Sequence, residues 1–113
     1  MTVKQLIDTL SLSEVTVADP DREVTGGYAG DLLSWVMGRA NEGDAWVTIM
    51  TNINVVAVAS LLDVSCVLLA EGVTAEADVI DTAKAKGVTL LGSDKPTYEL
   101  CKALAAALDG ETA

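Results

Sequence analysis

Histidine and phenylalanine are absent from this sequence of 113 residues, and all aromatic residues together make up 4% of it. Histidine is the usual proton shuttle of catalytic sites and the commonest metal ligand. Its absence excludes His-dependent triads, Cys–His nucleophiles and the usual zinc hydrolases, and we expect neither a metal site nor a cofactor. Half of the chain is apolar, so the core must consist mainly of Val, Leu and Ala side chains.

Basic residues are scarce: seven Lys and Arg stand against 17 Asp and Glu, which gives a net charge of −10. A surface of this charge repels phosphate backbones and anionic lipid headgroups, so we expect no binding to nucleic acid or membranes. The longest apolar run, residues 55–62, is far shorter than the roughly 20 residues of a membrane-spanning helix. Polar residues interrupt the region that an N-terminal signal peptide would need, so we expect a cytoplasmic protein.

Two phosphate-binding motifs are also missing. The sequence contains no Gly-x-x-x-x-Gly-Lys-Ser/Thr string and no Gly-x-Gly-x-x-Gly string. The first absence excludes the ordinary kinase and ATPase machinery, and the second excludes the dinucleotide fingerprint. Cys66 and Cys101 lie in apolar periodic segments, so we expect both thiols to be reduced and largely buried.

What the sequence does contain is a regular alternation of short apolar segments and amphipathic ones. Thr2 and Gln5 form a capping box that opens a short helix, and residues 14–18 are a candidate strand. The pattern then predicts strands at 22–25, 45–50, 65–70 and 88–91, and helices at 31–41, 54–62, 74–86 and from Pro96 onward, with Asp31 and Thr74 as N-caps. This alternation implies an α/β fold, a three-layer α/β/α sandwich with a mostly parallel sheet. We expect one domain over residues 1–113, with a frayed tail from residue 109.

In such sheets, ligands bind in the crevice beyond the carboxyl ends of the strands. We expect four loops to meet there, with a glycine-rich loop at residues 26–30 joining a strand to a helix. A glycine pair lets backbone N–H groups approach a ligand, and a helix N-terminus attracts anions. The candidate ligand-binding residues are Thr25, Gly26, Gly27, Tyr28, Thr51, Asn52, Ser93, Asp94 and Lys95.

Some of these residues also have a simpler interpretation. The glycine pair can form a tight turn that needs positive φ, and Asp94 can cap the last helix. Lys95 can be exposed, or it can pair with a phosphate group. An enzyme acting on a phosphorylated metabolite, with Lys95 and the glycine loop holding phosphate and Asp94 as base, therefore stays open as an alternative.

Two features favour self-association. The helix predicted at residues 54–62 is apolar on every side, and such a helix is normally buried all round. Trp35 lies off the apolar stripe of its own helix and is expected to face outward. We therefore expect a homodimer. The candidate interface residues are Trp35, Val55, Val58 and Leu62.

The segment Asp21-Arg-Glu-Val-Thr-Gly-Gly27 resembles the motif from which the DRTGG domain family takes its name. The resemblance continues through residues 28–37, 42–44, 46–50, 54–59 and 98–100, and so covers almost the whole chain. It implies a fold related to the N-terminal domain of HPr kinase/phosphorylase. The match is most similar to small single-domain members found near iron-only hydrogenase subunits. Only Thr25, Gly26, Gly27 and, less directly, Arg22 carry over as motif positions, and the family attaches no catalytic role to them.

The family's contexts imply a regulatory, dimer-forming module, in some cases beside adenine-nucleotide sensing. Our leading hypothesis is a non-catalytic module that senses a small anionic ligand, such as an adenine nucleotide, and acts on a metabolic enzyme complex such as a hydrogenase. The alternatives are the enzyme described above and a pure protein-interaction scaffold.

Overall fold

The protein is built on one five-stranded sheet with the strand order β1-β5-β4-β3-β2. Of its 113 residues, the computed structural model describes residues 1–110. The strands are β1 (Ser13–Thr16), β2 (Gly26–Ala29), β3 (Asp44–Thr48), β4 (Cys66–Leu69) and β5 (Leu90–Gly92). Strands β2 to β5 are parallel and β1 pairs antiparallel with β5, so the predicted mostly parallel sheet is confirmed.

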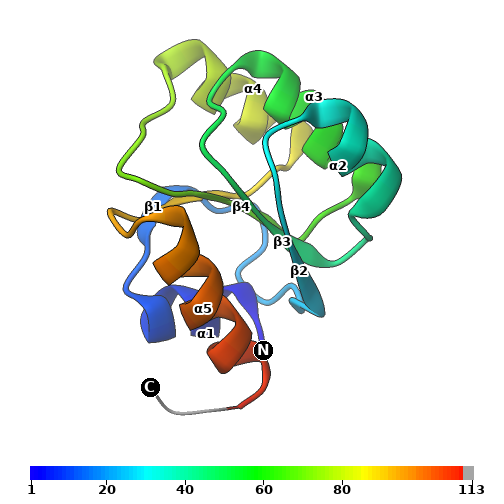
Figure 1. Cartoon of the computed structure of the whole chain (residues 1–113). Coiled ribbons are helices and arrows are strands. Elements are labelled where there is room, and N and C mark those ends of the chain that lie inside the picture. Colours follow the sequence, from blue (N-terminus) through cyan, green and yellow to red (C-terminus); the bar gives the residue numbers. More distant parts are fainter. Residues whose placement is uncertain (111–113) are drawn as a thin grey trace.

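Helices cover both faces of this sheet (Figure 1). Helices α1 (Val3–Leu10) and α5 (Thr97–Leu108) lie on one face. Helices α2 (Leu33–Arg39), α3 (Ile53–Leu62) and α4 (Ala77–Lys86) lie on the other. The predicted three-layer α/β/α arrangement is therefore confirmed.

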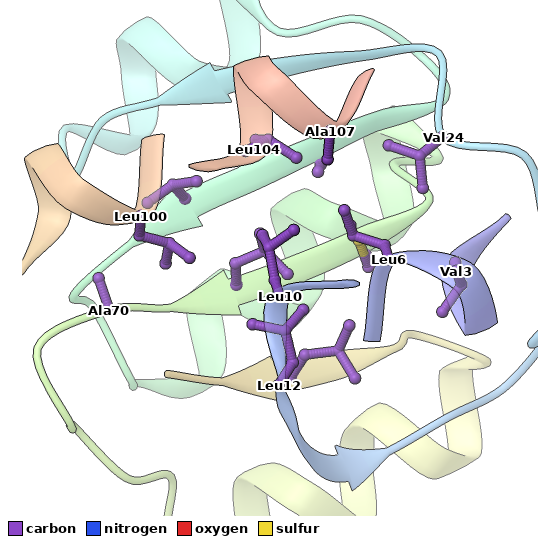
Figure 2. Close-up of a cluster of buried hydrophobic side chains, with 14 residues drawn as sticks. Val3, Leu6, Leu10, Leu12, Val24, Ala70, Leu100, Leu104 and Ala107 are labelled. Atoms are coloured by element: carbon purple, nitrogen blue, oxygen red, sulfur yellow. The ribbon is translucent and has the colours of Figure 1, made fainter. Parts of the chain in front are cut away.

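The alternation of side chains along the strands creates two separate cores. Ala45 and Val47 of β3 face the α1/α5 core, whereas Trp46 between them is fully buried in the α2–α4 core. Figure 2 shows the α1/α5 core, in which Leu6 and Leu104 come from opposite ends of the sequence. Both β3 and β4 are buried on both faces, which explains the continuous apolar sequence of β4 and the apolar centre of β3, Ala45 to Val47.

Helix ends agree with the sequence at some positions and differ at others. The Thr2–Gln5 capping box is present, and Gly87 ends α4 in the left-handed conformation. The predicted N-caps Asp31 and Thr74 are wrong, because α2 begins at Leu33 and α4 at Ala77. The Asp31 carboxylate instead accepts hydrogen bonds from Thr48 Oγ1 at 2.7 Å and from the Ile49 N–H at 2.9 Å, which ties the start of α2 to the end of β3.

The prediction of a strand at 22–25 and a glycine loop at 26–30 is wrong. The strand is β2 itself, and it consists of Gly26, Gly27, Tyr28 and Ala29. The only strand-like pairing of Glu23 in the described range is an isolated bridge with Thr2. Neither member of the glycine pair has positive φ, so the tight-turn interpretation is wrong as well.

The two cysteines differ in burial. Cys66 is fully buried in the α1/α5 core, as predicted, but Cys101 is only half-buried. Both thiols are free. No helix in the described range is both long and apolar enough to cross a bilayer. Most of the tail predicted to fray lies outside the described residues, although Asp109 ends α5 as its C-cap.

Candidate functional site

A hollow of about 420 Å³ lies between the edge strand β2 and helix α5. We call it the β2–α5 pocket. Its lining comes from β2, from β3 and from the last three turns of α5, and consists of Thr25, Gly26, Gly27, Tyr28, Ala29, Val47, Cys101, Leu104, Ala105, Leu108 and Asp109. It is therefore an open hollow at the edge of the sheet, beneath a helix that crosses β2 and β3.

Small side chains on one face of β2 explain the hollow. Gly27 and Ala29 alternate with Tyr28, so they face α5, while the Tyr28 ring packs against the α2–α4 core. A methyl group at Gly27 would lie 3.0 Å from Leu104 Cδ2, closer than side chains normally approach. Glycine at position 27 therefore lets α5 lie close to the strand.

Gly26 makes room on the opposite side of the strand. A methyl group there would lie 2.8 Å from Asp44 Oδ1, which belongs to the residue paired with Gly26 in the sheet. Asp44 is buried, and its Oδ2 accepts a hydrogen bond from the Asn41 N–H at 2.8 Å. The glycine pair is therefore explained by two close approaches to the strand and not by a turn.

The β2–α5 pocket offers neutral or negative groups to a ligand. Asp109 is the only charged residue of its lining, all of which falls in the described part of the chain. The C-terminus of α5 also lies at this end, and its carbonyl groups give the helix dipole a negative end. Thr25 adds a hydroxyl group, and Cys101 adds a thiol. Burial raises the pKa of this thiol, so it stays neutral. The pocket therefore suits an uncharged group that donates hydrogen bonds better than it suits an anion.

The remaining predicted ligand-binding residues lie outside this pocket. They were expected to meet the glycine pair in one crevice, but in the structure they lie apart from it. Thr51 and Asn52 border a hollow of about 310 Å³ beside Glu76 and Asp78. The Asn52 side chain caps α3 by accepting from the Asn54 N–H. Ser93 and Asp94 border a third hollow, of about 240 Å³, beside β1 and the loop before α4. These residues follow the carboxyl ends of β3 and β5, whereas Gly26 and Gly27 begin β2.

Lys95 and Asp94 do not form the arrangement that the enzyme alternative requires. Lys95 lines none of these three hollows, and its backbone N–H donates to Ser93 Oγ. The predicted cap role of Asp94 is wrong, since α5 has Pro96 at its N-cap. The carboxylate at the start of α5 is that of Glu71, which accepts from the Thr97 N–H at 2.7 Å. A carboxylate of the protein therefore already occupies the position where this helix would attract an anion.

Arg22 of the DRTGG-like motif has a structural role. Its guanidinium donates to Asp63 Oδ1 and to the Asp63 carbonyl oxygen, both at 2.8 Å, at the C-terminal end of α3. The hydrogen bond to Asp63 raises the pKa of Arg22, and burial of the guanidinium acts against this increase. A cation suits a helix C-terminus, so Arg22 fastens the segment before β2 to α3.

The four predicted interface residues do not all lie on one exposed surface. Val55 and Val58 are buried against their own chain, so the prediction that they face a partner is wrong. Leu62 is half-buried and packs against the same core. Trp35 is exposed on α2, as predicted. The sheet and the flanking helices cover the inner side of α3, and its outer side remains uncovered.

Sequence reasoning missed every α5 residue of the pocket. The sequence indicated only that Leu104 and Leu108 belong to the apolar stripe of the last helix and that Cys101 is a buried thiol. The alternation of Gly27 and Ala29 is the signal that, with residues 26–29 assigned as a strand, would have indicated a shallow face beneath a helix.

The fold has a solved counterpart. It is similar to the regulatory region of the Clostridium perfringens pyrophosphatase, a crystal structure of CBS and DRTGG domains in complex with the activator diadenosine tetraphosphate. The TM-score is 0.74 and the sequence identity 16%, over 99% of this chain and 50% of that one. This chain therefore spans half the length of its counterpart and has the expected DRTGG-type fold.

The sequence comparisons add no further relative. No family model matches the chain, and no curated protein matches it.

Proposed function

We propose that this chain is a non-catalytic regulatory module that senses a small ligand in the β2–α5 pocket. The observation that carries the proposal is the pocket itself, a hollow of about 420 Å³ at the DRTGG-like motif, with apolar walls and a few polar groups. Ligand sites are commonly concave, mostly apolar and about 300–1,000 Å³ in volume. The solved counterpart supports a regulatory role, because it is a regulatory region bound to an activator.

The ligand class follows from the charges of the lining. With Asp109 at one end and no basic side chain among the described lining residues, the pocket favours an uncharged flat group. We propose the adenine ring of an adenine nucleotide, whose exocyclic amine donates hydrogen bonds, with the anionic phosphates outside the pocket. The counterpart's activator carries adenine at both ends of a phosphate chain, which supports this choice. The sequence suggested a small anionic ligand such as an adenine nucleotide, and in this proposal its adenine ring, not its phosphates, occupies the pocket.

The regulated partner is a metabolic enzyme, and the resemblance to modules found near hydrogenase subunits makes a hydrogenase complex the first client to test. In this proposal the ligand stabilises one arrangement of α5 over β2, and the client binds one arrangement better than the other. Ligand and client then change each other's affinity by the same factor.

Thermal denaturation with adenosine, adenine nucleotides and inorganic tripolyphosphate tests the ligand class. A ligand at about 100 times its dissociation constant stabilises the fold by about 2.7 kcal/mol. Adenosine and the nucleotides should raise the melting temperature, and tripolyphosphate should not. Stabilisation by tripolyphosphate alone would contradict binding through adenine, and no stabilisation by any of them would favour a scaffold. Recovery of a hydrolysed or transferred product would favour the enzyme alternative.

Two substitutions locate the binding. Ala105 lines the pocket and is exposed, so Ala105→Trp should fill it and abolish the shift. Ala85 is also exposed, on α4 across the sheet, and Ala85→Trp is the matched control. Bound ligand should also protect the half-buried Cys101 thiol from alkylation, since Cys101 lines the same pocket. Unchanged binding in Ala105→Trp would place the ligand elsewhere.

A further inference from the structure

The two edges of the sheet, β1 and β2, differ in how they are protected against pairing with a further strand (Figure 1). An exposed edge offers free N–H and C=O groups to other chains, and proteins commonly block it with charged side chains, proline or β-bulges. Strand β1 has an irregular register between Glu14 and Thr16, and Glu14 is exposed. Strand β2 pairs with β3 in continuous register and consists of Gly, Gly, Tyr and Ala. Both strands have four residues, so β2 is the more open edge for its composition and regularity and not for its length.

The free backbone groups of β2 follow from its pairing with β3. The Gly30 N–H, just after the strand, donates to the Val47 carbonyl oxygen at 3.1 Å, so Gly30 directs its backbone groups toward β3. Because these groups alternate between the two sides of a strand, Tyr28 also faces β3, whereas Gly27 and Ala29 face away from it. Both Gly27 and Ala29 are exposed. Their N–H and C=O groups therefore lie along the open edge at the two-residue spacing that an added strand requires.

We propose that β2 binds an extended segment of a partner protein, which becomes a sixth strand of the sheet. Strand addition is a recurring mode of peptide recognition, in which backbone hydrogen bonds give affinity and alternate side chains give specificity. That the partner is the regulated client enzyme rests on the proposed function. The binding of the segment does not require the nucleotide, because the free backbone groups lie along the outer edge of β2, beside the β2–α5 pocket.

Charge determines which segment fits this edge. Asp109 and the negative C-terminal end of α5 lie beside β2, and the whole chain has a net charge of −10. A segment that contains Lys or Arg is attracted to such a surface, whereas a second copy of this acidic chain is repelled. Leu104 and Leu108 form an apolar wall on the α5 side of β2, where apolar side chains of the added strand can pack. The occupant is therefore a basic extended segment with apolar residues at alternate positions.

Selection from a displayed library of random linear peptides, without nucleotide, tests the proposal. The enriched sequences should contain Lys or Arg and alternating β-branched residues, and fluorescence anisotropy of synthetic versions gives the dissociation constant. Each residue of one such peptide is then methylated in turn on its amide nitrogen. Methylation should raise the dissociation constant about tenfold or more at every second residue, where the N–H donates to β2, and change it little at the residues between. Binding losses without this alternation would overturn the proposal.

Substitutions in the protein locate the peptide. Ala29→Pro removes an N–H that faces away from β3, an edge position where proline is tolerated, and should raise the peptide dissociation constant about tenfold or more. Ala77→Pro is the matched control, because Ala77 is exposed at the first position of α4, where proline suits a helix. Asp109→Asn should weaken a basic peptide, and Asp81→Asn, at an exposed position of α4 across the sheet, should not. Circular dichroism checks the fold, and the methylated peptides decide the question without any change in the protein.

Other outcomes would also overturn strand addition. If the library yields no binding peptide, the edge does not accept an extended segment, and equal binding by the wild type and folded Ala29→Pro would place the peptide elsewhere. Self-association of the wild type that Ala29→Pro abolishes in sedimentation would assign the edge to a second copy. The ligand proposal is tested separately, by thermal denaturation with nucleotides and by Ala105→Trp, so either proposal can fail while the other holds.

Discussion

Gly26 and Gly27 are strand residues whose missing side chains make room for Asp44 on one side of the sheet and Leu104 on the other. Arg22, a few residues earlier, is held by Asp63. Three residues of the DRTGG-like motif therefore have structural explanations that need no ligand. The same two glycines nevertheless shape the β2–α5 pocket, so one feature serves both packing and binding.

Gly27→Val should destabilise the protein. Its side chain would press on Leu104 Cδ2, which a Cβ would already approach to 3.0 Å, and overpacking of this kind commonly costs about 1–3 kcal/mol. Urea denaturation measures the change. Gly38→Ala is the control with the opposite sign, because a methyl group there meets nothing within 4 Å and alanine favours a helix by about 1 kcal/mol. Equal stability of Gly27→Val and the wild type would contradict the close packing.

Cys66 should make the protein less stable at alkaline pH. Burial raises the pKa of its thiol from 9.0 to about 12, so between these values the unfolded chain releases a proton that the folded chain keeps. The contribution of the protonated Cys66 thiol to the free energy of unfolding is complete below pH 9. It is lost at about 1.4 kcal/mol per pH unit as the pH rises toward 12.

Urea denaturation at pH 8 and pH 10 checks this expectation. Between the two values the wild type should lose about 1.4 kcal/mol more than Cys66→Ala. Other groups titrate in both proteins and cancel from the comparison. Parallel pH dependences in the two proteins would contradict the burial of the thiol.

At the scale of elements, α5 is held at its start by a residue from another loop. Glu71, which has a φ of 61°, accepts a hydrogen bond from the Thr97 N–H in the first turn of α5. Helix α4 lacks such a contact, because Glu76 at its N-cap makes no side-chain hydrogen bond. This contact fastens the start of the helix whose later turns line the pocket.

Glu71→Ala should therefore lower stability by about 1 kcal/mol, the usual cost of removing a side-chain cap. Glu76→Ala should cost less, since no cap is lost. Thermal denaturation of both variants gives the comparison. If the proposed ligand binds beneath α5, Glu71→Ala should also weaken ligand binding more than Glu76→Ala does. Equal effects of the two variants would show that ligand binding does not depend on the Glu71 cap.

Many of the helices and strands could be predicted from the sequence. Strands β3 and β4 can be predicted because both of their faces are buried and their sequences are therefore rich in apolar residues. Thr2 and Gly87 indicate helix ends, because local hydrogen bonds and backbone geometry determine those positions. Strand β2 could not be assigned, because its residues are small for reasons that lie in Asp44 and Leu104, distant in the sequence. The pocket was missed for the same reason, and only its β2 side was among the predicted residues.

At the scale of the whole molecule, the sheet joins two cores that share β3, β4 and β5. The amides of β3 and β4 should exchange with solvent only through global unfolding, because both faces and both edges of these strands are covered. Amides of the edge strand β2 should exchange faster. Native-state hydrogen exchange measures both, and uniform rates across the sheet would contradict this ranking.

The pairing of β1 with β5 has a consequence for the synthesis of the protein. Strand β1 is synthesised before β5 and finds this partner only when β5 has been made, roughly 4 to 16 s later at about 5–20 residues per second. During that interval Leu6, Leu10 and Leu12 have no α5 to pack against, whereas the strands and helices of the α2–α4 core appear in succession and can begin to assemble. We therefore expect α1 and β1 to complete their packing later during synthesis than the elements of the α2–α4 core.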